Sequence, residues 1–207
     1  MSLIYGTGSF TRFKVEGGIS EENREIFQTN ISRYAFRNLD ENSDEERSTG
    51  WVSIMDMFDS AFADINYFKE PCIALSWRVD VRSVPIKALR QYSREAEEKI
   101  KTSEELEHIS KNRRQEIKEA VRIKLLKRAI PRSNIYDMIW NVQTGLVIFA
   151  ATSTKLCDEF SEFFLKCFGL HLMTVFPYSM ASDILKGEEV DPGLLEELEY
   201  SVGMEGD

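Results

Sequence analysis

The residues of this chain best suited to binding chemistry are the basic side chains between positions 111 and 132. This segment holds nine Lys or Arg and two Asp or Glu, a net charge of +7. Three of the cations recur every fourth residue, which would align them on one face of a helix. Such a row can meet successive phosphates of a DNA backbone, with salt-dependent affinity and little base preference. The candidate DNA-binding residues on this basis are Arg114, Lys118, Arg122, Lys124, Lys127, Arg128 and Arg132.

Two other interpretations of the basic segment remain open. A solvated helix face would show the same pattern, and six acids between Glu95 and Glu107 favour that interpretation for the residues before 111. An amphipathic helix lying on a membrane surface is the other alternative. The apolar stripe formed by Ile117, Val121, Leu125 and Ala129 lacks the Trp or Phe typical of such helices.

Residues that could act in catalysis are present, but not at the spacing that catalysis needs. The two histidines, His108 and His171, have no nearby Cys or carboxylate pair suited to a metal site or a triad. The segment 6–9, GTGS, lacks the Lys of a phosphate loop, and a strand bulge is expected there. We expect no catalytic residue, no metal site and no cofactor. The acids Asp56, Asp59, Asp64 and Asp80 are predicted to be loop and turn residues.

Composition limits the class of protein. The 207 residues are 43% apolar and 29% charged, with thirteen Phe, seven Tyr and three Trp, which is enough for a substantial core. A wholly disordered chain and a disulfide-stapled scaffold are therefore excluded. Three cysteines without CxxC spacing indicate reduced thiols in a cytoplasmic protein. The sequence contains no apolar run long enough to span a membrane and no signal-peptide pattern at residues 1–13.

Charge is distributed unevenly along the chain. The whole protein carries a net charge of −9, yet residues 87–132 contain 14 bases and 8 acids, a net charge of +6. The remainder has 12 bases and 27 acids. Total charge alone argues against a nucleic-acid binder, whereas the local excess of positive charge supports one.

The hydrophobic pattern predicts the elements that would position these residues. Residues 85–130 are expected to form two charged helices broken near Thr102-Ser103, and Pro131 ends them. Residues 136–150 are expected to form a β-hairpin around Gln143-Thr144-Gly145. Apolar residues from Leu156 to Phe168 recur at helical spacing, and Gly169 closes that helix. The remaining predictions are strands at 3–15, 51–58, 72–81 and 171–176, a helix at 22–37, a loop at 38–49 and a turn at 64–70.

These elements predict an α+β fold, in which an antiparallel or mixed sheet is packed by helices and a charged helical finger projects from it. The predicted central domain comprises residues 1–84 and 133–180, and the finger comprises residues 85–132. Residues 181–207 are predicted to be an acidic, peripheral tail.

Four sequence blocks stand out: Gly50-Trp51-Val52, Pro85-Ile86-Lys87, the segment 125–132, and the segment 140–155 with the helix that follows it. They resemble blocks of the bacterial recombination-associated RdgC family. The first is similar to the family's GWV, and the second is similar to its P-x-V-I-K block. The segment 125–132, LLKRAIPR, resembles LLPRAFSR. The segment 140–155 and the following helix resemble a W-x-D-x-x-x-G-L block that ends in A-S-A-K-K. Their order and spacing agree across residues 1–180.

The resemblance implies a duplex-DNA-binding protein of the nucleoid that forms a ring-like homodimer and restrains RecA-driven recombination. It adds Lys87 to the candidate DNA-binding residues, beside the matching positions Arg128 and Arg132. It also implies that Ile130 lies at the finger tip and contacts a second subunit. Members of that family are longer, and their further C-terminal part supplies another dimer contact. An exonuclease label accompanies the family name.

The leading hypothesis is therefore a non-catalytic, sequence-independent binder of double-stranded DNA that modulates homologous recombination. The alternatives are a metal-dependent exonuclease and a protein-interaction module that uses the basic finger to dock an acidic partner.

Overall fold

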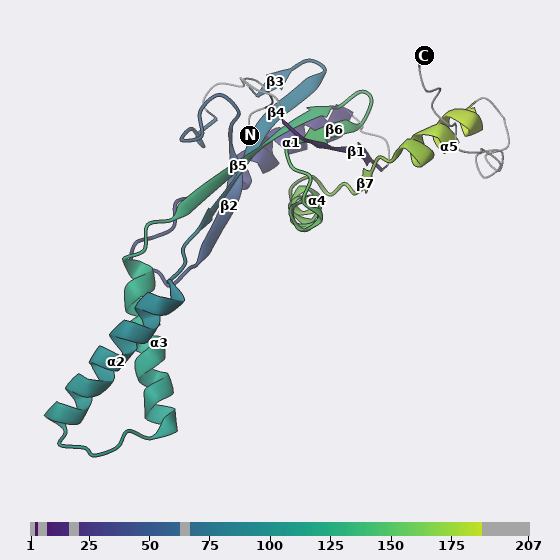
Figure 1. Cartoon of the computed structure of the whole chain (residues 1–207). Coiled ribbons are helices and arrows are strands. Elements are labelled where there is room, and N and C mark those ends of the chain that lie inside the picture. Colours follow the sequence, from purple (N-terminus) through teal and green to yellow (C-terminus); the bar gives the residue numbers. More distant parts are fainter. Residues whose placement is uncertain (1–2, 4–7, 17–20, 63–66, 188–207) are drawn as a thin grey trace, which may run out of the picture.

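A seven-stranded sheet carries a helical hairpin at one end (Figure 1). The structure is a computed structural model, and it describes residue 3 and residues 8–16, 21–62 and 67–187. The strand order is β2-β4-β5-β6-β1-β7, with β3 also paired to β4, and every pairing between these strands is antiparallel. The fold is therefore α+β, as predicted. The strands are β1 (Thr11–Val15), β2 (Arg47–Ser53), β3 (Phe68–Lys69), β4 (Cys72–Val81), β5 (Arg132–Asn141), β6 (Leu146–Phe149) and β7 (Leu172–Thr174).

Helices α1 (Glu21–Arg33) and α4 (Thr154–Phe168) cover one face of the sheet. Alternation along the strands turns Trp77, Trp140 and Phe149 toward this face, where all three are buried. The ring of Phe160 on α4 stacks on Phe149 with 3.9 Å between centroids. The predicted C-terminal glycine of α4, Gly169, adopts the left-handed conformation with φ of 69°.

The opposite face of β4 and β5 buries charged side chains. Arg78 donates two hydrogen bonds to Asp80, from Nε to Oδ1 at 2.9 Å and from Nη2 to Oδ2 at 2.8 Å. The Arg78 guanidinium also lies 4.1 Å from the ring centroid of Phe36. Ser76 donates to Asp137 across the strand pair at 2.7 Å. These charges are satisfied inside the protein and serve the fold.

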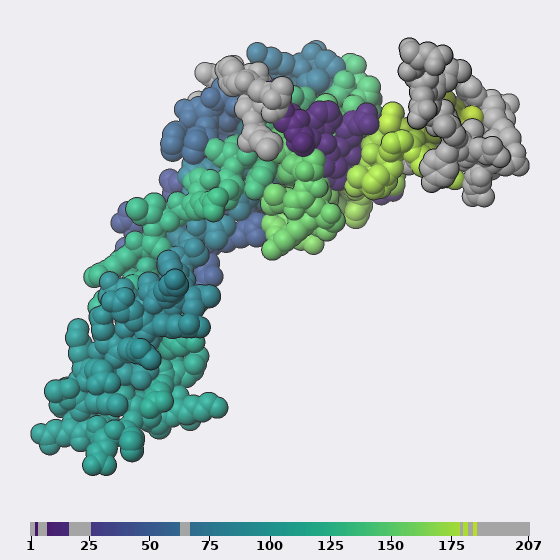
Figure 2. Space-filling model, in the orientation of Figure 1, coloured from purple at the N-terminus to yellow at the C-terminus, as the bar shows by residue number. Residues whose placement is uncertain are grey.

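Helices α2 (Ile86–Ser103) and α3 (Lys111–Lys127) form the hairpin, which is inserted between β4 and β5. The last residue of β4, Val81, pairs with the first residue of β5, Arg132. The hairpin therefore continues the line of two adjacent strands and extends away from the sheet (Figures 1 and 2). Its turn is formed by residues 104–110, and the Ser110 side chain caps α3 by accepting a hydrogen bond from the Arg113 backbone N–H.

Several predicted boundaries were wrong. The strand predicted at 51–58 exists but with other bounds: it runs over Arg47–Ser53, so it takes up the end of the predicted loop 38–49 and ends before residue 54. Pairing begins earlier because the residues from Arg47 to Gly50 align with those from Val81 back to Arg78 in β4. Gly50 also lies against the backbone of Phe36, where a Cβ at position 50 would be 2.4 Å from the Phe36 Cα. Of the strand predicted at 3–15, residues 11–15 form β1, residues 3 and 8–10 are outside any strand, and residues 4–7 lie outside the described residues. Helix α1 ends at Arg33 instead of residue 37.

The end of the chain also differs from the prediction. A helix, α5 (Pro177–Gly187), follows β7, although Pro177 was predicted only to stop a strand. Proline is well suited to the first turn of a helix because its missing N–H would have no intrahelical partner there. Residues 188–207 of the predicted tail lie outside the described residues. Each helix in the described part of the chain is too short or too polar to cross a membrane.

Candidate nucleic-acid interface

One flank of the hairpin gathers cations from both of its helices. Lys87, Arg90 and Arg94 lie three and four residues apart on α2, so the helical repeat places them on one side. Together with Lys118 of α3 they line a surface hollow of about 780 Å³. None of these four side chains forms an ion pair with any residue that the structure describes.

The two acids that also line this hollow are already engaged. Glu95 accepts a hydrogen bond from the Gln91 side chain at 3.0 Å. Glu97 lies 3.7 Å from Arg114, measured between Oε2 and Nε. The positive charge of the hollow is therefore only partly offset by its own residues.

Arg114 and Arg122 flank Lys118 on α3, as the four-residue spacing predicted, but both have acidic partners. Arg122 donates to Glu119 at 3.0 Å and also contacts Glu46, in the segment that leads into β2. The hydrogen bond with Glu119 and the negative charge of Glu46 raise the pKa of Arg122. Arg122 therefore ties the hairpin to the sheet, and it is less available to a ligand than Lys118.

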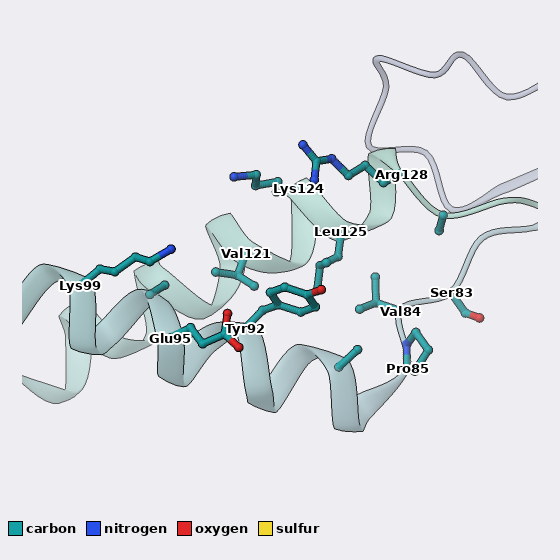
Figure 3. A pocket seen from close by; sticks show the side chains of 13 residues that line it. Ser83, Val84, Pro85, Tyr92, Glu95, Lys99, Val121, Lys124, Leu125 and Arg128 are labelled. Carbon is teal, nitrogen blue, oxygen red and sulfur yellow. The ribbon is translucent and has the colours of Figure 1, made fainter.

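A second depression lies on the other flank of the hairpin and differs in chemistry (Figure 3). Tyr92 of α2 and Leu125 of α3 lie beside each other in a hollow of about 590 Å³. The side chains of Lys99, Lys124 and Arg128 lie along its rim. This flank therefore combines an apolar floor with cations at the edge, whereas the first flank is lined mainly by charged and polar groups.

The remaining predicted residues cluster at the base of the hairpin. Lys127 belongs to the last turn of α3, Arg128 caps that helix, and Arg132 begins β5; all three are exposed. Ile130 lies between them and is 91% exposed. The structure corrects the expected position of Ile130, because the tip of the hairpin is formed by residues 104–110 and Ile130 is at the opposite end. A dimer role for Ile130 stays a prediction.

A family model described as "Putative exonuclease, RdgC" matches residues 10–185. The chain belongs to the RdgC family. Comparison with curated proteins gave no match. The match covers the sheet, the hairpin and most of α5, so both flanks of the hairpin lie within the family region. At the family level, RdgC proteins are recombination-associated DNA-binding proteins of the nucleoid.

Three residues that line the first hollow were not predicted from the sequence: Arg90, Ser93 and Arg94. The nearby acids Glu95, Glu97 and Glu98 made this part of the RdgC chain resemble an ordinary solvated helix. The signal that could have identified Arg90 and Arg94 was their helical spacing from Lys87, the residue selected from the family resemblance. Summed charge obscured this signal because it does not separate the flanks of a helix.

The exonuclease label of the RdgC family directs attention to the acids and histidines. Asp56 and Asp59 accept backbone N–H bonds from Phe58 and Ala61, at 2.9 and 3.0 Å, and are turn residues as predicted. Asp80 is not a loop acid, because it is buried in β4 and paired with Arg78. Within the described residues, no three His, Cys, Asp or Glu side chains gather in a group that could hold a metal ion.

The histidines and cysteines occupy separate places. His108 is exposed in the turn of the hairpin, and His171 is exposed before β7. The three cysteines are free thiols, and Cys157 and Cys167 lie on the buried face of α4. Burial raises the pKa of Cys167 to about 12, which keeps the thiol protonated and unreactive at neutral pH. Asp64 and the first half of the GTGS segment, Gly6 and Thr7, lie outside the described residues.

Proposed function

We propose that this RdgC-family chain binds double-stranded DNA without sequence preference through its α2–α3 hairpin. By coating or encircling duplex, it restrains RecA and so modulates homologous recombination. The observation that carries the proposal is the hollow lined by Lys87, Arg90, Arg94 and Lys118, whose cations have no ion-pair partner among the described residues. Unpaired cations on a projecting element are available to a ligand without the loss of an internal contact.

The charge distribution supports the hairpin as the point of contact. Residues outside 87–132 hold 12 bases against 27 acids, so the rest of the chain repels a polyanion on balance. Each Lys or Arg that meets a DNA phosphate releases condensed counterions, which favours binding at low salt. The hairpin holds its charge away from the acidic sheet, and this separation reduces the repulsion that a bound duplex would experience.

The test is a gel-shift titration of the full chain with random-sequence duplex at about 50 and 200 mM salt. We expect retention that falls log-linearly with salt and is unchanged when base composition changes. Absence of retention at the lower salt concentration would contradict the proposal and favour the interaction-module hypothesis.

A nuclease is the second candidate because the matching family model carries an exonuclease description. We propose that the chain acts without catalysis, since the acids at Asp56, Asp59 and Asp80 have structural partners. End-labelled duplex should stay intact during incubation with magnesium or manganese. Shortening that a chelator abolishes would establish the nuclease instead.

A second copy of the chain is part of the proposal, because two hairpins can enclose a duplex where one can only touch it. Ile130 is the proposed contact. An isoleucine exposed over 91% of its surface, next to Arg128 and Arg132, contributes nothing to the core of its own chain. Cover by a partner would remove this apolar surface from water.

A further inference from the structure

The flank of the hairpin that carries Tyr92 is not used by the proposed function. Its hollow of about 590 Å³ (Figure 3) adjoins another of about 370 Å³, and the two share Ala96, Val121 and Lys124 as lining residues. Together they form one groove along the line where α2 and α3 meet. We call it the seam groove, and its floor is formed by Ala88, Tyr92, Ala96, Ile117, Val121 and Leu125.

The floor of the seam groove is apolar but only partly covered by the chain itself. The hairpin stands clear of the sheet (Figure 1), and the buried apolar residues of α3 are Ile117 and Leu126. Val121 and Leu125 stay half-buried, and Tyr92 is 47% exposed. Covering the floor would remove this apolar surface from water, which favours a ligand with an apolar face that fits the groove.

Positive charge surrounds the floor. Lys99, Lys124 and Arg128 lie along the rim, and none of the three forms an ion pair with a residue that the structure describes. A ligand complementary to this rim carries negative charge along its edges.

The acids among the described lining residues do not neutralise the rim. Glu95 accepts a hydrogen bond from the Gln91 side chain at 3.0 Å. Glu116 accepts one from Arg113, also at 3.0 Å. Both carboxylates are therefore engaged, and the rim cations stay available to a ligand.

The shape of the seam groove selects a helix. Its α3 wall runs from Ile117 to Arg128, which is about 17 Å, or about three turns, at about 1.5 Å per residue. Ala88, Ala96 and Ala120 also line it, and small side chains let a helix backbone approach closely. An amphipathic helix of this length can lay apolar side chains at i, i+4 and i+7 on the floor.

We propose that the seam groove binds an acidic amphipathic helix of a partner protein. The apolar side chains of that helix pack over Tyr92 and Leu125, and its carboxylates pair with Lys99, Lys124 and Arg128. Lys124 and Arg128, which the sequence pattern places among the DNA contacts, thus serve a protein. This binding goes beyond the proposed function, and it leaves the opposite flank free to hold DNA.

Nucleic acid fits the seam groove less well. Single-stranded DNA is held by aromatic rings that stack on successive bases, and Tyr92 alone is aromatic among the described residues that line the groove. Duplex DNA presents its phosphates outward, so an apolar floor adds little to its binding.

The probe for this proposal is a labelled synthetic peptide of about 14 residues, with Leu at i, i+4, i+7 and i+11 and Glu at most other positions. Fluorescence anisotropy with the full chain, at about 150 mM salt to screen diffuse attraction, should show saturable binding. A control peptide of the same composition, with its leucines spread around the helix, should bind at least about tenfold more weakly. Equal binding of the two peptides, or no binding of the first, would overturn the proposal.

Replacing Tyr92 tests the floor without changing charge. Tyr92→Ala should weaken binding of the amphipathic peptide by about tenfold, because an aromatic anchor is lost. Tyr92→Phe keeps the ring and should bind as the wild-type chain does. Circular dichroism checks that the hairpin stays helical, and duplex affinity should be unchanged in both variants. Full peptide affinity in a folded Tyr92→Ala would mean that the peptide lies outside the seam groove.

A matched pair of double variants tests the rim. Lys99→Gln with Lys124→Gln removes two charges from the rim, and Lys87→Gln with Lys118→Gln removes two from the opposite flank. All four residues are exposed, so folding should be unaffected. The first variant should mainly weaken the peptide, by at least about fivefold, and the second should mainly weaken duplex. Equal losses of both ligands in both variants would show a diffuse positive surface and overturn the proposal.

Duplex binding is measured separately, so its absence in the wild-type chain would contradict the proposed function and leave the peptide result standing. Three other occupants of the groove have signatures of their own. A second copy is indicated if Tyr92→Ala halves the solution mass measured by light scattering. Single-stranded DNA is indicated if its affinity falls in Tyr92→Ala together with that of the peptide. The chain's own acidic segment is indicated if peptide binding begins only after Glu196 and Glu197 are replaced with Gln. Each of these three results would overturn the assignment to a partner protein.

Discussion

The sheet and the hairpin of this protein treat charge in opposite ways. In the sheet, Arg78, Asp80 and Asp137 are buried. Arg78 is hydrogen-bonded to Asp80, and Asp137 accepts a hydrogen bond from Ser76. On the hairpin, Lys87 and Lys118 are exposed and have no described ion-pair partner. A buried pair is costly to break because the remaining charge stays out of water, whereas an exposed cation costs the fold little when removed. The comparison separates charges that maintain the structure from those free to meet a ligand.

The largest effect expected from this comparison is on stability, in the sheet. Asp80→Ala leaves the Arg78 guanidinium buried without its carboxylate, so the free energy of unfolding should fall by about 3–5 kcal/mol. Urea denaturation followed by tryptophan fluorescence measures the loss. Replacing Arg78 and Asp80 together with Leu should cost less than Asp80→Ala alone. A single variant as stable as wild type would mean that the pair is not structural.

On the hairpin, the larger effect should fall on binding. Reversing both charges with Lys87→Glu and Lys118→Glu places two carboxylates in the hollow with Arg90 and Arg94. Affinity for duplex should fall by at least about tenfold at low salt, because two phosphate contacts become repulsive. The melting temperature should change little, since exposed substitutions alter stability by about 0.5 kcal/mol or less. Unchanged affinity would remove the basis for assigning DNA to this flank.

Much of the fold could be predicted from the sequence, because the patterns that identify several helices and strands lie within consecutive residues. The Phe residues at helical spacing identified α4, and Gly169 identified its end. The alternation after Cys72 identified β4, and the long charged segment between Pro85 and Pro131 identified two helices. Each of these signals needs only neighbouring residues to be read.

The features that the sequence left hidden depend on contacts between distant segments. The start of β2 is set by its pairing with the end of β4, and Gly50 fits there against the Phe36 backbone. Asp80 is a structural residue because it is buried and hydrogen-bonded to Arg78, whose guanidinium lies over the Phe36 ring. Arg90 and Arg94 become part of one hollow with Lys118 only after α2 and α3 pack together. In the net charge of this segment, Arg90 and Arg94 are offset by their acidic neighbours. The net charge therefore does not show on which flank of the helix the two arginines lie.

An effect of intermediate size is expected at Ile130, and it concerns the association of two chains. Ile130→Asp should halve the solution mass measured by light scattering, because a carboxylate would be placed in an apolar contact between two chains. The melting temperature of the fold should stay close to that of wild type, since the 91% exposure of Ile130 leaves no core contact to lose. DNA retention should weaken along with the mass. A wild-type chain that is already monomeric would end this hypothesis.

The smallest effect concerns the acidic segment 183–207, which begins within α5 and competes with DNA for the hairpin in our interpretation. Residues 183–207 contain nine acids and one Lys, a net charge of −8 that is similar in size to the +7 of residues 111–132. A tethered polyanion acts at a high effective concentration, so even weak attraction to the hairpin would reduce the apparent affinity for duplex. Attraction between separate copies would act in the same direction at high protein concentration.

Replacing Glu188, Glu189, Glu196 and Glu197 with Gln keeps the chain length and removes four negative charges. Duplex affinity should rise by about threefold at 50 mM salt and by less at 200 mM, because screening already weakens the competing contact at the higher concentration. The same four substitutions combined with Lys87→Glu and Lys118→Glu should give no gain, since the acids would then have lost the cations they occupy. A gain of equal size in both backgrounds would instead indicate general repulsion between the acidic segment and DNA. That result would separate long-range charge from competition at the hairpin.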